Sequence, residues 1–290
     1  MILFPNCKIN LGLRILNKRP DGFHNLETIF CPIPLKDAAE ITSFPGKKEQ
    51  AEGFELVITG SAIPGEPSGN LCTRAWQLIK HDFPHIPPVR MHLHKAIPIG
   101  AGLGGGSSDG AFTLMLLNKE FRLNLSKDKL IEYAIKLGSD CPFFIVNKPC
   151  HATGRGEILQ EINVPLDDYY FVLVQPDIHV KTGWAFAELT SSIGHPLPNH
   201  AATNNPSLTE IIQQPVNTWK DMLINDFEIP VFKLHPLLKD IKQILYEAGA
   251  EYASMTGTGS SIYGIFSKNK KAANLRSDEN YKVYILNHSH

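Results

Sequence analysis

The chain reads Pro98-Ile-Gly-Ala-Gly-Leu-Gly-Gly-Gly-Ser-Ser108, between a segment of strand character and an apolar helical segment over 111–117. Five of these eleven residues are glycine, and two hydroxyl side chains follow. Glycines let backbone N–H groups approach an anion without a Cβ atom in the way. The N-terminus of a helix adds unpaired N–H donors and the positive end of its dipole. This pattern favours a site for the polyphosphate of a nucleotide.

Other kinds of glycine loop fit the sequence less well. The Walker pattern ends in Gly-Lys-Ser/Thr, whereas no lysine precedes Ser107. The dinucleotide pattern G-x-G-x-x-G is matched from Gly100, but its acidic partner would be Glu120, near the end of the helix and not at the end of the next strand. The protein-kinase motifs His-Arg-Asp and Asp-Phe-Gly are absent from the sequence. A turn without a ligand needs one or two glycines, because each further glycine costs folding entropy.

The composition and length indicate a globular protein of one large or two ordinary domains. The chain has 290 residues and a formal net charge of −1, so nothing in its charge favours nucleic acid or an anionic membrane as a partner. Five cysteines without tight spacing argue against a disulfide framework. The first residues lack the basic region and apolar core of a signal peptide. We therefore expect a cytoplasmic protein with no membrane and no nucleic-acid partner.

Segments of strand and helix character alternate irregularly along the chain, which favours an α+β (mixed α/β) fold with two lobes. A Pro-, Asn- and His-rich stretch over 191–206 predicts a long surface loop. Gly138 is expected to end the helix before it. The predicted strands are 8–16, 23–30, 54–59, 89–95, 169–174, 252–256 and 262–266, and the predicted helices are 71–81, 111–117, 129–137, 182–189, one around 211, and 236–248.

Three segments together resemble the GHMP kinases, a family that includes galactokinase, homoserine kinase and mevalonate kinase. They are the glycine loop, Lys8-Ile-Asn-Leu-Gly-Leu13 and Thr256-Gly-Thr-Gly-Ser-Ser261. Two more, Arg19-Pro-Asp-Gly-Phe-His24 and Leu137-Gly-Ser-Asp-Cys-Pro-Phe143, are similar to the branch that phosphorylates a cytidine-diphosphate-linked methylerythritol in non-mevalonate isoprenoid synthesis. The resemblance spans about residues 5 to 266. It implies an N-terminal ATP-binding domain over 1–150, a C-terminal domain over 151–290, and an active site between the lobes.

The resemblance assigns catalysis to Asp140 as general base and to Lys8 as the cation that keeps Asp140 ionised and stabilises the developing alkoxide. Taken alone, the spacing around Asp140 favours a helix N-cap over a catalytic role. Lys8 and Asn10 share one face of the alternating strand 8–16, and a lone strand lysine is usually solvated.

The same resemblance implies ATP with Mg²⁺, the metal being held by Ser107. The two serines also suit helix N-caps. Asp109 is left out, because its charge would repel phosphate. The Thr256 loop is expected to back the glycine loop, the alternative being a plain hairpin. The expected ATP-binding residues are Pro98, Ile99, Gly100, Ala101, Gly102, Leu103, Gly104, Gly105, Gly106, Ser107 and Ser108, with Asn70 and Lys95 near the adenine and ribose.

The implied small-molecule partner carries a cytosine, which needs aromatic faces and hydrogen bonds at its edge. His24 would read the base edge and Phe23, where the branch usually has tyrosine, would cover a face. Phe186 or its neighbour Trp184 would stack from the other side, with core packing as the alternative for both. Asn10 and Thr182 would also contact the substrate.

Two further functions stay open at this point. One is a GHMP kinase of the homoserine or mevalonate type, against which the segment ending at His24 argues. The other is a nucleotide-binding regulator without turnover, against which the presence of both Lys8 and Asp140 argues. The sequence is compatible with a monomer or a weak homodimer.

Overall fold

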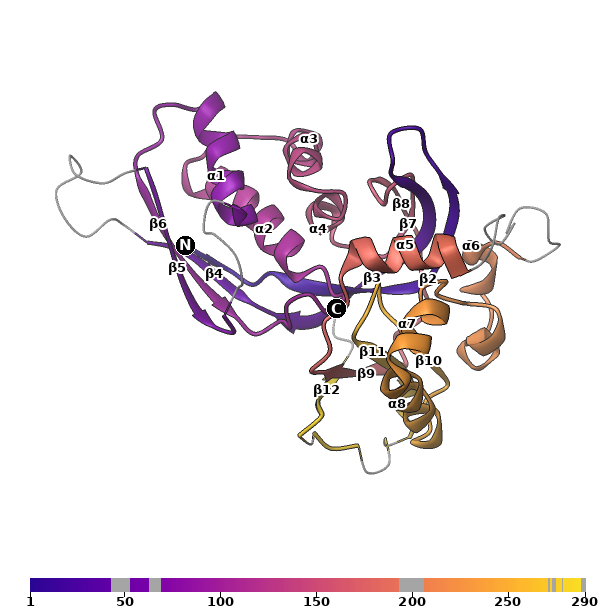
Figure 1. The fold of residues 1–290 in the computed structure, drawn as a ribbon. Helices are drawn as coiled ribbons and strands as arrows, with labels where there is room; N and C mark the ends of the chain where they lie inside the picture. Colours follow the sequence, from indigo (N-terminus) through magenta and orange to yellow (C-terminus); the bar gives the residue numbers. More distant parts are fainter. Residues whose placement is uncertain are drawn as a thin grey trace. The chain divides into compact units, whose positions relative to one another are not determined.

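The computed structural model describes residues 1–42, 53–62, 69–192, 206–270, 272, 275–277 and 279–287. The chain forms two compact units that interleave along the sequence. The first comprises Met1–Cys7, Leu35–Ile99 and Gly104–Lys148, and the second comprises Lys8–Pro34, Gly100–Leu103 and Pro149–His290. Strands and helices occur in both units, which confirms the predicted α+β (mixed α/β) class (Figure 1). The predicted domain boundary near residue 150 stays a prediction.

The first unit contains a four-stranded sheet covered by helices. Its strand order is β1-β4-β6-β5, with β5 and β6 parallel and the other pairs antiparallel. Helices α1 and α2 pack on the sheet, and α3 and α4 pack on α2 (Figure 1). The elements are β1 (Ile2–Leu3), β4 (Ala38–Thr42), β5 (Phe54–Gly60), α1 (Leu71–Asp82), β6 (Val89–Lys95), α2 (Gly105–Glu120), α3 (Lys127–Leu137) and α4 (Cys141–Val146).

Local sequence signals set the ends of these helices. The side chain of Asn70 accepts the N–H of Cys72 at the start of α1, and Ser126 accepts the N–H of Lys129 at the start of α3. Such caps satisfy N–H groups that lack an acceptor within the helix. Helix α3 ends at Gly138, as predicted.

The second unit contains two four-stranded sheets. One has the order β2-β3-β7-β8, and the other has the order β10-β11-β9-β12 with antiparallel pairing throughout. Ile262 pairs with Val174 in the second sheet. The strands are β2 (Asn6–Lys18), β3 (His24–Lys36), β7 (Cys150–Thr153), β8 (Ile158–Glu161), β9 (Tyr169–Pro176), β10 (Tyr252–Met255), β11 (Ile262–Ser267) and β12 (Tyr281–Asn287).

Helix α8 packs against β10 and β11, and α7 packs against both α8 and α5. Leu238, Ile241 and Leu245 recur at helical spacing on α8 and are buried in the apolar core of this unit. The remaining elements are α5 (Thr182–Ser192), α6 (Leu208–Ile211), the 3₁₀ helix η3 (Val216–Asp221), α7 (Glu228–Leu234) and α8 (Pro236–Glu247).

Strand β2 is more deeply buried than its alternating sequence indicates. Every residue from position 6 to position 15 is buried, so both faces of the strand are covered. Lys8 is only 4% exposed and Asn10 only 2%. A lysine is rarely buried unless its ammonium group is paired, so the burial of Lys8 indicates partners for its charge.

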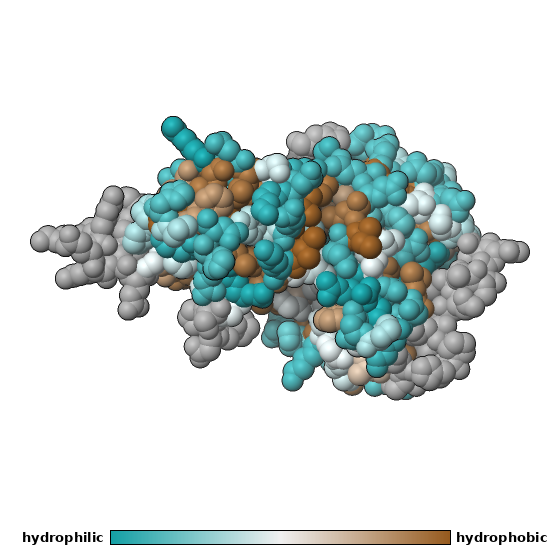
Figure 2. All heavy atoms as spheres, turned by 90° about the horizontal axis from the view of Figure 1, so that it is seen from above, coloured by the Kyte–Doolittle hydropathy of each residue, from teal (hydrophilic) through white to brown (hydrophobic). Residues whose placement is uncertain are grey.

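The first two residues of the predicted long loop, 191 and 192, belong to a helix instead. Helix α5 continues to Ser192, and residues 193–205 lie outside the described part of the chain. Among the described residues, no helix combines the length and the apolar content that spanning a membrane requires. On the face shown in Figure 2, hydrophilic residues predominate among the coloured atoms, and hydrophobic residues gather in several patches between them.

Candidate active site

The glycine loop depends on backbone conformations that favour glycine. Gly100, Gly102 and Gly104 have φ angles of 67°, 78° and 69°, in the left-handed region. A Cβ atom on Gly102 would overlap the carbonyl group of Thr256, and one on Gly105 would lie 2.9 Å from Cγ2 of Ile97. Gly102 is therefore required by close approach as well as by φ, which argues against an ordinary turn.

The loop between β10 and β11 packs against residues 101 and 102 of the glycine loop, within the second unit. The N–H of Ser261 donates to the carbonyl of Ala101 at 3.2 Å, and the hydroxyl of Thr256 lies 3.1 Å from the carbonyl of Gly102. These contacts confirm that the Thr256 loop backs the glycine loop.

Lys8 and Asn10 belong to a buried polar network in the second unit. Lys8 Nζ donates to Asn10 Oδ1 at 2.6 Å and lies 4.6 Å from the centre of the Phe30 ring. Asn10 Nδ2 donates to the hydroxyl of Thr28 at 2.9 Å, and the N–H of Asn10 donates to the hydroxyl of Thr256 at 3.1 Å. The amide and the aromatic face account for an ammonium group on a buried strand, since each stabilises its charge.

The backbone of the same strand is tied to the glycine loop. The N–H of Lys8 donates to the carbonyl of Leu103 at 3.0 Å, and the Tyr263 hydroxyl donates to the carbonyl of Asn10 at 2.7 Å. Lys8, Asn10 and loop residues 100–103 therefore have fixed positions relative to one another.

Asp140 lies in the first unit, directly before α4. It occupies the N-cap position with φ −84° and ψ −15°, but its side chain makes no capping hydrogen bond. The carboxylate is thus not used as a helix cap, although the sequence alone allowed that role. Next to it, burial raises the pKa of the Cys141 thiol to about 12, so this cysteine is a neutral thiol. Because Lys8 belongs to the second unit, its pairing with Asp140 stays a prediction.

Helix α2 begins earlier than the serines of the loop. Gly104 is its N-cap, which places Ser107 and Ser108 inside the first turn. The alternative role of these serines as N-caps is therefore wrong. The hydroxyl of Ser108 is buried and has no hydrogen-bond partner in the described part of the chain. The N–H groups of Gly105, Gly106 and Ser107 have no acceptor within the helix, so the start of α2 is suited to the phosphates of a nucleotide.

His24 and Phe186 lie face to face in the second unit. Their ring centres are 4.9 Å apart with an angle of 23° between the planes, and Phe186 meets Phe227 edge-on at 4.8 Å. Nε2 of His24 is buried and has no hydrogen-bond partner among the described residues. Burial and the charge of Lys18 hold the pKa of His24 below its usual range, so the neutral imidazole is favoured. A neutral imidazole can both donate and accept.

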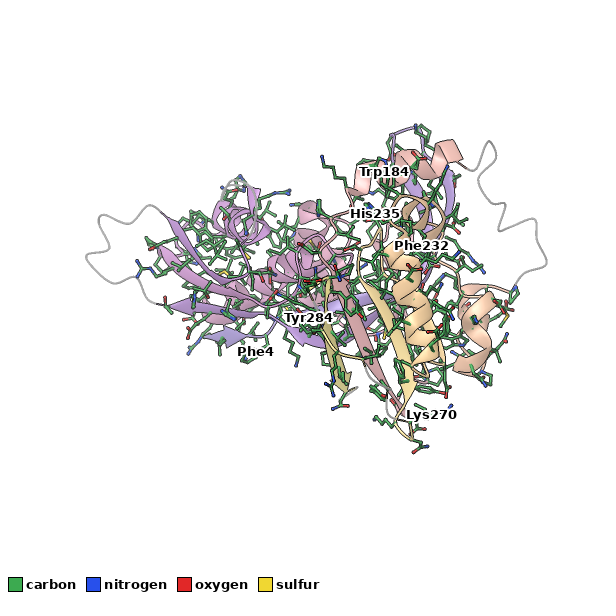
Figure 3. All side chains as sticks on the ribbon, turned by 60° about the horizontal axis from the view of Figure 1, so that its bottom comes forward. Phe4, Trp184, Phe232, His235, Lys270 and Tyr284 are labelled. Atoms are coloured by element: carbon green, nitrogen blue, oxygen red, sulfur yellow. The ribbon has the colours of Figure 1, made fainter. Side chains whose placement is uncertain are left out.

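The other predicted substrate residues differ in exposure. Phe23 is 54% exposed, and the Arg155 guanidinium lies 4.9 Å from its ring centre. Thr182 starts α5, with its hydroxyl 3.3 Å from that of Thr258. Trp184 lies on the same helix and, like Phe186, packs partly buried against the apolar core (Figure 3). Of the two predicted stacking candidates, Phe186 is the one whose ring meets His24.

The comparisons with known proteins agree with this geometry. The family model described as "GHMP kinases N terminal domain" matches residues 70–148, and "GHMP kinases C terminal" matches residues 198–282. A protein of Bacteroides fragilis named 4-diphosphocytidyl-2-C-methyl-D-erythritol kinase is 50% identical over 271 residues, which are 93% of this chain and 94% of that protein. The chain belongs to the GHMP kinase family. A protein of Porphyromonas gingivalis with the same name is 39% identical over 92% of each chain.

Solved structures of GHMP kinases share the fold. A crystal structure of 4-(cytidine 5'-diphospho)-2C-methyl-D-erythritol kinase has a TM-score of 0.72 and 29% identity, and the alignment covers 91% of this chain and 89% of that one. The Methanococcus jannaschii mevalonate kinase has a TM-score of 0.71 at 14% identity, covering 100% and 98%. The second likeness concerns the fold alone.

Two of the predicted ATP-binding side chains of this GHMP kinase are engaged within the first unit. Asn70 caps α1 through its side-chain oxygen. The ammonium group of Lys95 is buried and forms ion pairs with Asp37 and Asp109. Their contacts with the nucleotide stay predictions.

Thr28 and Phe30 were not singled out by sequence reasoning, although both lie in the segment that follows His24. Alternation along β3 places them on one face of that strand, and this signal alone could have grouped them. Their contact with Lys8 and Asn10 depends on the pairing of β2 with β3, which the local pattern does not reveal.

Proposed function

We propose that this GHMP kinase transfers the γ-phosphoryl group of ATP to the 2-hydroxyl of 4-diphosphocytidyl-2-C-methyl-D-erythritol. The observation that carries the choice of acceptor is the stacked pair of His24 and Phe186 with its buried, unpartnered Nε2 atom. A buried polar atom without a partner is costly unless a ligand satisfies it. The edge of a cytosine supplies both donors and acceptors, and its ring stacks on aromatic side chains.

The names of the relatives support the same acceptor, because these relatives align with nearly the whole chain at up to 50% identity. A homoserine or mevalonate acceptor has no ring, so it could not stack on an aromatic side chain as a cytosine does. The buried Lys8–Asn10 network supports catalysis over a purely regulatory role, since a buried ammonium is costly to keep without a function.

We assign the chemistry to residues of this chain as follows. Asp140 accepts the proton of the attacking hydroxyl. Lys8, oriented by Asn10, stabilises the negative charge that develops on the oxygen. The glycine loop and the first turn of α2 hold the phosphates through N–H groups, and Ser107 holds Mg²⁺. The metal supplies neutralisation of phosphate charge when it is bound.

Three finer points belong to the same proposal. The protein acts in the cytoplasm, it needs Mg²⁺, and it works as a monomer or weak homodimer without a nucleic-acid or membrane partner. Removal of Mg²⁺ with excess chelator is expected to stop phosphoryl transfer, because the phosphate charge is then not neutralised.

The test of the acceptor site uses His24→Ala and Phe186→Ala. Each is expected to cost ~1–3 kcal/mol of binding free energy, which lowers kcat/KM for the cytidine substrate about 5- to 150-fold. The loss is a hydrogen bond in His24→Ala and stacking in Phe186→Ala. Affinity for an ATP analogue should stay unchanged. Phe232→Ala is the matched control, because Phe232 is a partly buried aromatic against the same core (Figure 3).

Phe232→Ala is expected to lower the Tm and leave kcat/KM unchanged. If Phe186→Ala behaves like this control, Phe186 is a core residue only. If His24→Ala also leaves kcat/KM for the cytidine substrate at the wild-type value, the proposed acceptor is wrong.

A further inference from the structure

Two carboxylates and one ammonium group form a buried cluster in the first unit. Asp37 lies between β3 and β4, Lys95 ends β6, and Asp109 lies on α2, just after its first turn. Lys95 Nζ is paired with Asp37 Oδ2 and donates to Asp109 Oδ2 at 2.7 Å. All three side chains are buried: Asp37 is 0% exposed, Lys95 is 2% exposed and Asp109 is 3% exposed.

Asp37 also holds the chain where it enters the glycine loop. Its second oxygen, Oδ1, accepts the N–H of Ala96 at 2.6 Å and the N–H of Ile97 at 2.8 Å. These residues directly precede Pro98. One carboxylate therefore fixes two successive peptide groups and the lysine beside them.

The same cluster holds the chain where it leaves the glycine loop. Through Asp109, which follows the first turn of α2, Lys95 is connected to the start of this helix. A Cβ atom on Gly105 would lie 3.5 Å from Lys95 Nζ, so the backbone of this first helical residue packs directly on the cluster. Both ends of the loop are thus fixed by one network of side chains.

Stability alone gives a weak reason for such a cluster. Buried ion pairs lose solvation, and apolar replacements are often neutral or stabilising. Here two carboxylates share one ammonium, and Oδ1 of Asp109 is buried without a hydrogen-bond partner among the described residues. Burial raises the pKa of Asp109 to about 7, against the opposing effect of Lys95. The desolvation cost of this network is explained if the network fixes the backbone conformation of the glycine loop at both of its ends.

We propose that Asp37 is a positioning residue that sets the conformation of the phosphate loop through Ala96, Ile97 and Lys95. Lys95 serves the same purpose and acts on ATP through the loop, not by direct contact of its ammonium group. The proposal rests on the proposed function, because it takes ATP to be the ligand of the loop.

Asp37→Ala removes the ion pair and both amide contacts, whereas Asp37→Asn keeps an oxygen for the amides. Binding of a non-hydrolysable ATP analogue is measured by calorimetry, together with kcat and both KM values. Asp37→Ala is expected to raise the analogue Kd and the KM for ATP ~10-fold or more, because small displacements of binding groups are costly. The KM for the cytidine substrate should not change, and Asp37→Asn should restore part of the affinity.

Asn118→Ala is the control, because the side chain of Asn118 bonds the N–H and the carbonyl of Leu125 at the other end of α2. It should lower the Tm without changing the analogue Kd. The proposal is overturned if Asp37→Ala also lowers only the Tm. If Asp37→Ala does not fold, an unchanged Kd in Asp37→Asn overturns it. A wild-type chain that binds no analogue would instead overturn the proposed function.

Discussion

Asp140→Asn is expected to lower kcat by ~10²–10⁴-fold, because an amide cannot accept the proton of the attacking hydroxyl. The substitution is nearly isosteric, and the Asp140 side chain makes no capping hydrogen bond to α4. The fold and the affinity for an ATP analogue should therefore be preserved. Steady-state kinetics with the cytidine substrate, alongside a thermal melt, measure both parts of this expectation.

Asp128→Asn provides the control, since Asp128 is an exposed carboxylate in the first turn of α3 in the same unit. Turnover of this variant should match the wild type. Lys8→Ala should also lower kcat sharply, and the double variant Lys8→Ala/Asp140→Asn should be little worse than the poorer single one if the two act together. Wild-type turnover in Asp140→Asn would remove this residue as the general base.

Gly102→Ala should abolish measurable binding of an ATP analogue. The affinity should fall at least ~10²-fold, because displacement of a binding element by about 1 Å can have an effect of this size. The new Cβ atom would overlap the carbonyl of Thr256, and backbone cannot move aside as a flexible side chain can. The positive φ of 78° adds strain of ~1–2 kcal/mol. The loop must shift, and its N–H groups then no longer point at the phosphates.

Gly249→Ala separates loop displacement from backbone strain. Gly249 follows α8 and has a φ of 100°, but a methyl group added there would meet no described atom within 4 Å. The substitution should lower the Tm through strain and leave analogue binding intact. Equal affinities in Gly102→Ala and the wild type would show that the glycine loop is not the phosphate site.

Most elements of the fold follow from periodicity and end signals in the sequence. The sequence predicted a helix over 236–248 and the end of another at Gly138, and the structure confirms both, as α8 and the end of α3. The start of α2 was missed, because Ser107 and Ser108 resemble caps while Gly104, in a left-handed conformation, takes that position. A side chain that can cap is a local signal, whereas the left-handed turn depends on the whole loop.

The sequence motifs named individual residues of the candidate site, but they did not predict which of these residues contact one another. The sequence motifs pointed to Lys8 and Asn10, yet their partners Thr28 and Thr256 lie 18 and 246 residues from Asn10. The pairing of Asp37 with Lys95 likewise joins residues 58 positions apart. Contacts of this kind are set by strand pairing and packing, which local spacing does not encode.

The most direct measurement compares kcat/KM for phosphoryl transfer from ATP to four acceptors. Release of ADP gives the rate, and ³¹P NMR identifies the phosphorylated products. The acceptors are 4-diphosphocytidyl-2-C-methyl-D-erythritol, free methylerythritol phosphate, homoserine and mevalonate. Two base contacts worth ~1–3 kcal/mol each predict that kcat/KM for the cytidine substrate exceeds the others by ~10²-fold or more. Equal or greater kcat/KM for homoserine or mevalonate would contradict the proposed function.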